Sequence, residues 1–173
     1  FAEQGMCIIG LEPSCLFTLR DELKLLLPGK KSDLISSKAL LLEEFLAQGI
    51  DSGTFSLDLQ PLSQKKALLH GHCHQKAFSA MEATEKILSM IPELSFTTIQ
   101  SSCCGMAGAF GYEPENQAVS LAMGELNLFP IIRAADDKTL IVADGTSCRH
   151  QVYDGTQKQA VHVVRILEAA LAN

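Results

Sequence analysis

The chain has 173 residues, a formal net charge of −6 and 47% apolar residues. This length supports one domain with a hydrophobic core, and the apolar fraction excludes a largely disordered chain. The acidic balance and the lack of any basic run argue against nucleic acid as a main partner. No apolar stretch approaches the roughly 20 residues of a membrane-spanning helix, so no transmembrane segment is expected.

Six cysteines are too few for a disulfide-dense secreted scaffold. No secretion signal is recognisable, so we expect a cytoplasmic protein, with peripheral attachment to a membrane left open. In a reducing compartment, clustered thiols favour metal binding or catalysis. The chain starts at Phe1 without a methionine, and a core-like apolar run begins by residue 7. We therefore expect a C-terminal piece of a longer polypeptide.

The first third of the chain is predicted to contain one strand and two helices. Residues 7–11 form a short apolar run, which is typical of a buried parallel strand. Leucines recur on one face over residues 16–27, which predicts a helix with its leucines in the core. A second helix is expected over residues 37–48, and weak alternation over residues 54–59 predicts a short edge strand.

The rest of the chain alternates strands with helices. We expect strands over residues 67–70, 94–99 and 139–143, and helices over residues 78–91, 119–126 and 162–171. Pro130 is expected to kink the helix that begins at residue 119 or to begin a new one. The order β-α-α-β-α-β-α-β-α predicts an α/β fold, with an open, mostly parallel sheet and helices on both faces.

Cysteines follow the predicted strands directly. They are Cys15, Cys73, Cys103, Cys104 and Cys148. Because ligands bind beyond the carboxyl ends of strands in such sheets, we expect these thiols at one edge. Thiolates favour zinc, copper(I) and iron–sulfur clusters.

The adjacent cysteines are unusual, since two neighbours cannot easily ligate one tetrahedral ion. Cys103 and Cys104 could instead reach two metals of a cluster, and Gly105 would allow a bulky group to approach the backbone. Cys15 is predicted in a first helical turn, where the helix dipole lowers a thiol pKa. Cys7 is interpreted as a small buried hydrophobe.

Histidines surround the second cysteine. His72 and His74 alternate about Cys73, so they would point to opposite faces of a continuing strand; either could ligate zinc or support a cluster by hydrogen bonding. Three other histidines are weaker candidates. His70 and His162 are interpreted as structural, while His150 is left open between the two roles.

Three stretches resemble a known cysteine-rich domain. They are residues 71–76 (Gly-His-Cys-His-Gln-Lys), 103–108 (Cys-Cys-Gly-Met-Ala-Gly) and 145–148 (Gly-Thr-Ser-Cys). Together they resemble the CCG domain of heterodisulfide reductase B subunits and of the iron–sulfur subunit of glycolate oxidase, where it usually occurs as a tandem pair. Residues 10–15 and 102–112 are most similar to the C-terminal part of FAD-linked oxidases of the D-lactate and D-2-hydroxy-acid dehydrogenase type.

The resemblance covers nearly the whole chain. It implies one cysteine-rich domain over residues 1–173, with residues 1–60 as the tail of a preceding copy and residues 61–173 as one complete copy. It also implies an iron–sulfur cluster, of the 4Fe-4S class and noncubane in the best understood members, with zinc in some copies. The implied cluster-binding residues are Cys73, Cys103, Cys104 and Cys148, with Gly105 beside them and Cys15 from the preceding copy.

The resemblance implies an electron-transfer role in a FAD-linked 2-hydroxy-acid oxidoreductase. Electrons would pass from FAD in an upstream domain of the same polypeptide to an acceptor, either a quinone or an electron-transfer protein. No Gly-x-Gly-x-x-Gly motif occurs at a strand–helix junction, so this part alone is not expected to be catalytic.

Two departures from the family pattern keep alternatives open. The family's Cys-x-x-Cys motif has Gly145 in place of its first cysteine, and Glu12 in the earlier copy. Fewer thiols are compatible with a structural zinc module, while Cys103-Cys104 is compatible with thiol–disulfide chemistry.

Overall fold

The computed structural model describes residues 1–101 and 103–172, so Ser102 of the family motif lies outside the described residues. Its main sheet has the strand order β4-β3-β5-β6, and every pairing is parallel. The strands are β3 (Lys66–Leu69), β4 (Ser95–Thr98), β5 (Thr139–Val142) and β6 (Ala160–Val161). This arrangement confirms the predicted α/β fold with a parallel sheet.

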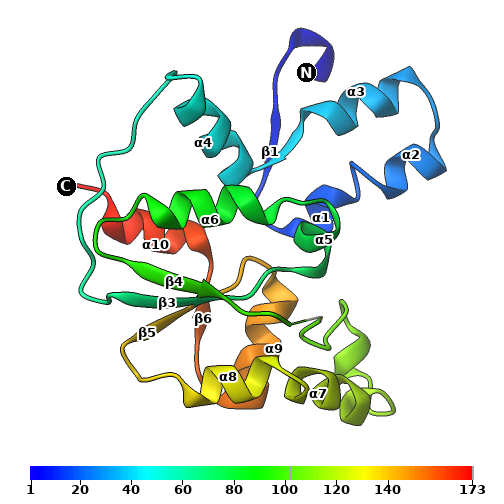
Figure 1. Ribbon diagram of the computed structural model, residues 1–173. Coiled ribbons are helices and arrows are strands. Elements are labelled where there is room, and N and C mark those ends of the chain that lie inside the picture. The colour runs from blue at the N-terminus through cyan, green and yellow to red at the C-terminus, as the bar shows by residue number, and fades with distance from the viewer. Residues whose placement is uncertain (102, 173) are drawn as a thin grey trace.

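Helices cover both faces of this sheet (Figure 1). On one face lie α6 (Met81–Ser89) and α10 (Val163–Ala170), and on the other lie α8 (Leu128–Ala134) and α9 (Thr146–Thr156). Beside α9 pack η2 (Phe110–Tyr112) and α7 (Gln117–Glu125). Each face has its own apolar core, because the β-strand side chains alternate between the two.

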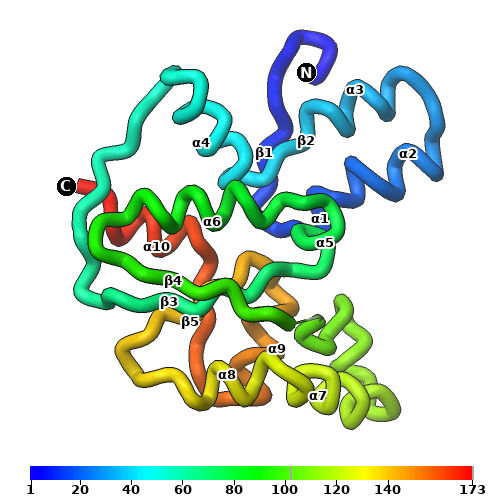
Figure 2. Tube along the Cα trace, in the orientation of Figure 1, coloured from blue at the N-terminus to red at the C-terminus, as the bar shows by residue number. Residues whose placement is uncertain are grey.

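The N-terminal part forms a smaller unit around two parallel strands, β1 (Ile8–Gly10) and β2 (Ala39–Leu41). Its helical elements are η1 (Ala2–Gln4), α1 (Pro13–Phe17), α2 (Glu22–Leu26), α3 (Lys30–Lys38) and α4 (Leu42–Asp51). Figure 2 shows α1 running beside α5 (Cys73–Ala77), which brings the loop after β1 to the edge of the main sheet.

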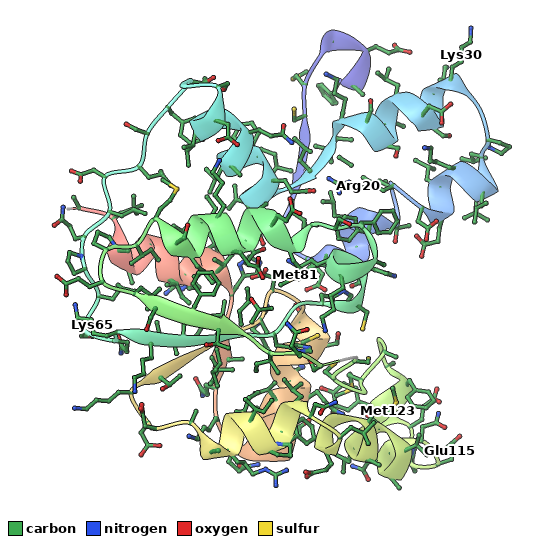
Figure 3. The ribbon with its side chains drawn as sticks, in the orientation of Figure 1. Arg20, Lys30, Lys65, Met81, Glu115 and Met123 are labelled. Atoms are coloured by element: carbon green, nitrogen blue, oxygen red, sulfur yellow. The ribbon has the colours of Figure 1, made fainter. Side chains whose placement is uncertain are left out.

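One ion pair ties this unit together. Arg20, labelled in Figure 3 between the helices of the N-terminal part, reaches both carboxylate oxygens of Glu44 at 3.0 and 2.5 Å. Glu44 also accepts the Leu41 backbone N–H at 2.8 Å, so its carboxylate caps the start of α4. The pair therefore connects the end of α1 to the β2–α4 junction.

Several element predictions for the first sixty residues were wrong. The helix over residues 16–27 is broken between α1 and α2, and the leucines at its far end are exposed rather than in the core. Residues 39–41 form a strand within the predicted helix 37–48, because their backbone pairs with β1. Residues 54–59 form only the isolated bridge of Leu59 with Leu171.

In the main sheet the three predicted strands are confirmed as β3, β4 and β5, with small shifts in their bounds. The predicted helix 78–91 is found as the shorter α6, and Ser79, whose φ is 55°, separates it from α5, which was not predicted. Pro130 lies in the first turn of the new helix α8. Helix α9 and strand β6 were not predicted, since polar residues dominate the helix and the strand has only two residues.

In the described part of the chain, every helix is too short or too polar to cross a membrane.

Candidate metal centre

Loops after β3, β4 and β5 meet at the carboxyl edge of the main sheet around a cavity of about 300 Å³. Four of the predicted cysteines line this cavity together with two predicted histidines. The lining residues are Ser14, His72, Cys73, His74, Cys103, Cys104, Ala107, Gly108, Ser147 and Cys148. All six cysteines of the chain are thiols in this structure.

Cys73 is held at the start of α5 by a cap. The His72 ring accepts the His74 backbone N–H at 3.2 Å, and Gln75 Oε1 accepts the His72 N–H at 2.9 Å. The strand therefore does not continue through His72 and His74, and the prediction that they face opposite sides was wrong. Their rings lie 5.4 Å apart, and both residues line the cavity.

The Cys103–Cys104 loop depends on Gly105. Its φ is +98°, a left-handed conformation that side chains rarely adopt, and a Cβ there would overlap the Ser120 carbonyl. The Ser120 hydroxyl donates to the Gly105 carbonyl at 2.8 Å, and Gly105 N–H donates to Cys103 Sγ at 3.3 Å. This close fit of backbone against α7 directs Cys103 into the cavity.

Cys148 lies in the first turn of α9 and is almost completely buried. Its Sγ, Cys104 Sγ and a ring nitrogen of His70 lie within 4.8 Å of one another. The other side of the His70 ring is held by a 2.9 Å hydrogen bond between Nδ1 and the Ser101 hydroxyl. The ring also interacts with Cys148 and lowers the pKa of that thiol.

His70 was interpreted as structural from the sequence, yet it adjoins the thiols. The available signal was its place at the end of β3, where the sheet's carboxyl edge begins.

The four thiols of the cavity are hydrogen-bonded to one another, and these bonds lower the pKa of two of them and raise the pKa of the other two. The pKa of Cys103 is lowered to about 2 by hydrogen bonds from Cys104, Cys73 and the Gly105 N–H. The pKa of Cys148 is lowered to about 5, chiefly by a hydrogen bond from Cys104 and, against the effect of burial, by His70. The same bonds raise the pKa of Cys73 and Cys104. Ionisation is therefore favoured at Cys103 and Cys148 and disfavoured at Cys73 and Cys104.

This donor set fits a soft metal ion or an iron–sulfur cluster. The hydrogen bonds favour the thiolate form of Cys103 and Cys148, and a bound metal would displace the protons that remain on the other thiols. Among the described residues, nothing donates to or accepts from His74 Nδ1, which is buried, so an imidazole nitrogen is also available. Such orphaned buried polar atoms indicate a group that the cavity is built to hold.

The His72 ring occupies the space that a side chain at residue 145 would need. A Cβ at residue 145 would overlap the His72 ring and lie 3.3 Å from Cys148 Sγ. Burial lowers the pKa of His72, which favours the neutral, metal-binding imidazole. The position where the resemblance leads one to expect a cysteine side chain is thus filled by an imidazole.

The N-terminal cysteines lie apart from the cavity. Cys15 is exposed on α1, and its neighbour Ser14 lines the cavity instead. Cys7 is exposed as well, so its interpretation as a buried hydrophobe was wrong. It precedes the short strand β1, whose other edge has no partner strand among the described residues.

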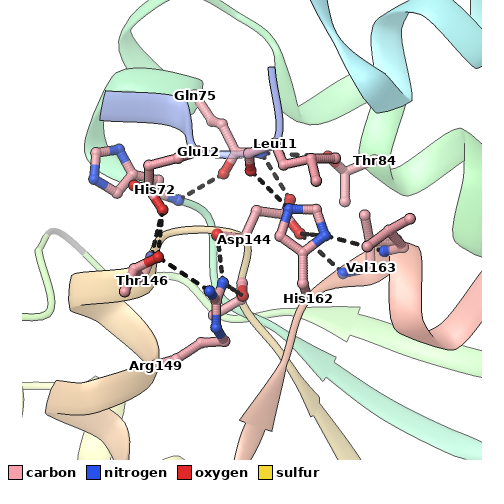
Figure 4. A network of polar contacts seen from close by, with 12 residues as sticks. Leu11, Glu12, His72, Gln75, Thr84, Asp144, Thr146, Arg149, His162 and Val163 are labelled. Atoms are coloured by element: carbon pink, nitrogen blue, oxygen red, sulfur yellow. Dashed lines mark hydrogen bonds and ion pairs between the residues drawn. The ribbon is translucent and has the colours of Figure 1, made fainter. Parts of the chain in front are cut away.

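Glu12 connects the N-terminal unit to the cavity, a role that sequence reasoning missed. Its Oε2 accepts the Thr146 backbone N–H and hydroxyl, both at 2.7 Å, and Ser14 donates to Oε1 at 2.9 Å (Figure 4). Burial alone would raise the pKa of Glu12, but these hydrogen bonds outweigh it and lower the pKa. The carboxylate therefore fixes the first turn of α9, two residues before Cys148.

His150 points away from the cavity. Its Nδ1 is 3.0 Å from the Tyr112 hydroxyl, in a surface pocket on the outer side of α9. The structure thus separates it from the thiols, although only one residue lies between it and Cys148 in the sequence.

Residues 67–153 match the family described as the CCG cysteine-rich domain. The chain is 31% identical over 171 residues to the C subunit of the anaerobic glycerol-3-phosphate dehydrogenase of Escherichia coli strain K12, covering 98% of this chain and 41% of that protein. It is 28% identical over 152 residues to "D-2-hydroxyglutarate dehydrogenase" of the same strain, covering 87% of this chain and 14% of that protein.

A third relative is "D-2-hydroxyglutarate dehydrogenase" of Haemophilus influenzae, which is 28% identical over 170 residues, with 94% of this chain and 16% of that protein covered. The chain therefore spans less than half the length of these relatives. They place it in an oxidoreductase context.

Proposed function

The chain belongs to the CCG cysteine-rich domain family, and from that premise we propose that its thiol cavity holds an iron–sulfur cluster used for electron transfer. The observation that carries the proposal is the convergence of Cys73, Cys103, Cys104 and Cys148 on one cavity. The buried Nδ1 of His74, which has no hydrogen-bond partner among the described residues, belongs to a residue that lines the same cavity. A bound cluster would supply one-electron chemistry that no side chain here provides.

The residues around the cavity have distinct proposed roles. The four cysteines are the ligands, and His72 or His74 completes the set or supports it by hydrogen bonding. The Gly105 N–H that donates to Cys103 Sγ would raise the reduction potential by stabilising negative charge on sulfur. Cys15, exposed on α1, would ligate only after rearrangement of the N-terminal unit.

The larger enzyme is proposed to be a FAD-linked dehydrogenase of 2-hydroxy acids. Two relatives carry the name D-2-hydroxyglutarate dehydrogenase, and this chain spans 14% and 16% of their lengths. The flavin would lie in a preceding domain of the same polypeptide. This domain would pass its electrons to a quinone or to an electron-transfer protein.

Residues 1–60 are proposed to be the tail of a preceding copy of the domain. The supporting observation is a repeated pattern: β1, a helix carrying Cys15, and the parallel strand β2 follow the same order as β5, α9 with Cys148, and β6. In both cases the second strand leads directly into a helix that packs nearby.

A structural zinc ion is the second candidate for the cavity. The favouring observation is the compact group of His70, Cys104 and Cys148, whose ligand atoms lie within 4.8 Å of one another. Cysteine and histidine in this number are typical of zinc sites.

The deciding experiment measures iron, acid-labile sulfide and zinc, with EPR, on protein purified and reconstituted without oxygen. We expect iron and sulfide together and an EPR signal on reduction. Both should be lost in the Cys103→Ser/Cys104→Ser double variant, because it removes half of the cavity's thiols.

Cys7→Ser is the matched control, since Cys7 is exposed and outside the cavity. It should keep the full iron content. Stoichiometric zinc without sulfide would replace the cluster by a structural ion. Absence of any metal, with a reversible two-electron thiol couple, would instead support thiol–disulfide chemistry.

A further inference from the structure

A second group of metal-binding side chains lies behind the cysteine cavity. Glu43 in the first turn of α4, Asp144 after β5 and His162 before α10 each place one ligand atom within 4.8 Å of the others. All three residues are buried, with exposed fractions of 1%, 1% and 8%. Gln75 separates them from the cavity, since its amide bonds Asp144 on one side and the His72 N–H on the other.

Glu43 is the residue that the described structure leaves unexplained. Both of its carboxylate oxygens are buried, and no N–H or O–H of another described residue donates to either one; the group that faces them is the carboxyl of Asp144. The neighbouring Glu44 takes both Arg20 contacts and the α4 cap, so those donors are already used. A buried carboxyl without partners costs several kcal/mol unless a proton or a cation neutralises it.

His162 is oriented as metal-binding histidines are. Its Nε2 is 2.7 Å from the Leu11 carbonyl, an acceptor only, so Nε2 carries the proton and the lone pair is on Nδ1 (Figure 4). Nδ1 lies 3.6 Å from Asp144 Oδ1, close to the spacing of two ligands on one ion. A ligating histidine commonly donates its other N–H to a backbone carbonyl in this way.

Asp144 is supported from outside the group. Its Oδ1 accepts the Val163 N–H at 3.0 Å, and its Oδ2 accepts the Gln75 amide at 2.8 Å (Figure 4). Each oxygen keeps a second lone pair that another partner can use. Metal-bound carboxylates are typically held by such outer hydrogen bonds.

We propose that Glu43, Asp144 and His162 bind a divalent transition-metal ion, separately from the cysteine cavity. Two carboxylates and one neutral imidazole balance the charge of such an ion. This set of oxygen and nitrogen ligands suits zinc, iron(II) or manganese(II), and it suits soft ions that prefer thiolate ligands less well. A single shared proton would satisfy only one Glu43 oxygen, whereas a cation can satisfy both.

Binding has two consequences that can be measured. The Val164 N–H, which now donates to His162 Nδ1 at 3.1 Å, would lose that bond to the ion. Burial and the Asp144 charge raise the pKa of Glu43 to about 9, so the ion would displace a proton at neutral pH.

The experiment titrates the whole chain with Co²⁺ in the absence of oxygen and follows the optical spectrum. Cobalt in the cysteine cavity gives strong near-ultraviolet thiolate charge-transfer bands, whereas cobalt at Glu43 gives visible bands without them. We expect one equivalent of the second kind. Glu43→Gln should weaken its affinity at least about 10-fold, while Glu168→Gln, an exposed glutamate on α10, should leave it unchanged.

A measurement on the unaltered chain guards against a variant that fails to fold. With ¹⁵N-histidine labelling, the Nε2–H of His162 should show a cobalt-induced hyperfine shift. Cobalt that enters only with thiolate bands, or equal binding by folded Glu43→Gln, would overturn the proposal. Either result would assign the group as a carboxyl–carboxylate pair sharing one proton.

Discussion

Gly105 occupies a place that another residue could take only with strain and overlap. Its φ of +98° excludes side chains on conformational grounds, and the Ser120 carbonyl excludes them on steric grounds. Gly108, in the same loop, has a φ of +69°, but no described atom lies within 4 Å of the place that a Cβ would take. An alanine at Gly108 would therefore show the effect of backbone strain alone, whereas an alanine at Gly105 would show strain together with steric overlap.

Gly105→Ala should lower the free energy of unfolding by at least about 2 kcal/mol and reduce metal content, because α7 must move away from the thiol loop. Gly108→Ala should cost only about 1 kcal/mol, from strain alone. Urea unfolding and metal analysis of both variants check this. Equal losses would show that the contact with Ser120 has no effect.

Glu12 gives the N-terminal unit a pH-dependent attachment to α9. Its pKa is lower in the folded chain than in the unfolded chain, so its contribution is present above about pH 4.5 and is lost as the pH falls through the folded value. Glu12→Gln should therefore cost about 1 kcal/mol at pH 7, a modest value because solvent partly screens the carboxylate.

The measurement is urea unfolding of both proteins between pH 7 and pH 3. The difference between them should shrink as the pH falls from 4.5 through the lowered pKa of Glu12 in the folded chain. Glu168→Gln, on the exposed side of α10, should stay within about 0.5 kcal/mol of the parent at every pH. A difference that grows on acidification would contradict the argument.

At the scale of elements, α8 depends on glycines in its two neighbours. The fully buried Phe129 ring lies where a Cβ at Gly124 of α7 or at Gly155 of α9 would be. Both glycines therefore allow three helices to approach one ring. Phe129 belongs to the same hydrophobic core as Cys104 and Cys148.

In the Gly155→Ala variant, the higher helix propensity of alanine and the loss of good packing have opposite effects on the free energy of unfolding. Alanine favours a helix interior by about 1 kcal/mol, but overpacking a rigid core costs about 1–3 kcal/mol. We expect a net loss of about 1 kcal/mol, measured by thermal unfolding. Adding Phe129→Leu should make the alanine favourable, and a stabilised single variant would show that Phe129 can move.

At the scale of the whole molecule, three loops and the N-terminal unit converge on one cavity, so a bound metal should stabilise the entire fold. Ligand present at about 100 times its Kd adds about 2.7 kcal/mol. For a chain of this length we expect Tm to rise by about 5–10 °C after anaerobic reconstitution. Calorimetry before and after chelation checks this, and the Cys103→Ser/Cys104→Ser variant should show no rise.

The sequence was sufficient to predict three of the four strands of the main sheet. Strands β3, β4 and β5 are short apolar runs, and such runs with intervening helices leave few alternatives to parallel pairing. The meeting of Cys73, Cys103, Cys104 and Cys148 follows from the same rule, because each thiol comes directly after one of these strands. The family was recognisable from the same cysteine motifs.

Only the tertiary structure decided the remaining features. Strand β2 exists because β1 pairs with it, and its apolar residues alone are equally compatible with a helix. His70, His72 and Glu43 owe their positions to residues far away in the chain: Ser101, the loop at Gly145 and Asp144. Local pattern reports which residues are apolar and where the chain turns, whereas the environment of a buried polar group is set by whichever distant segments fold against it.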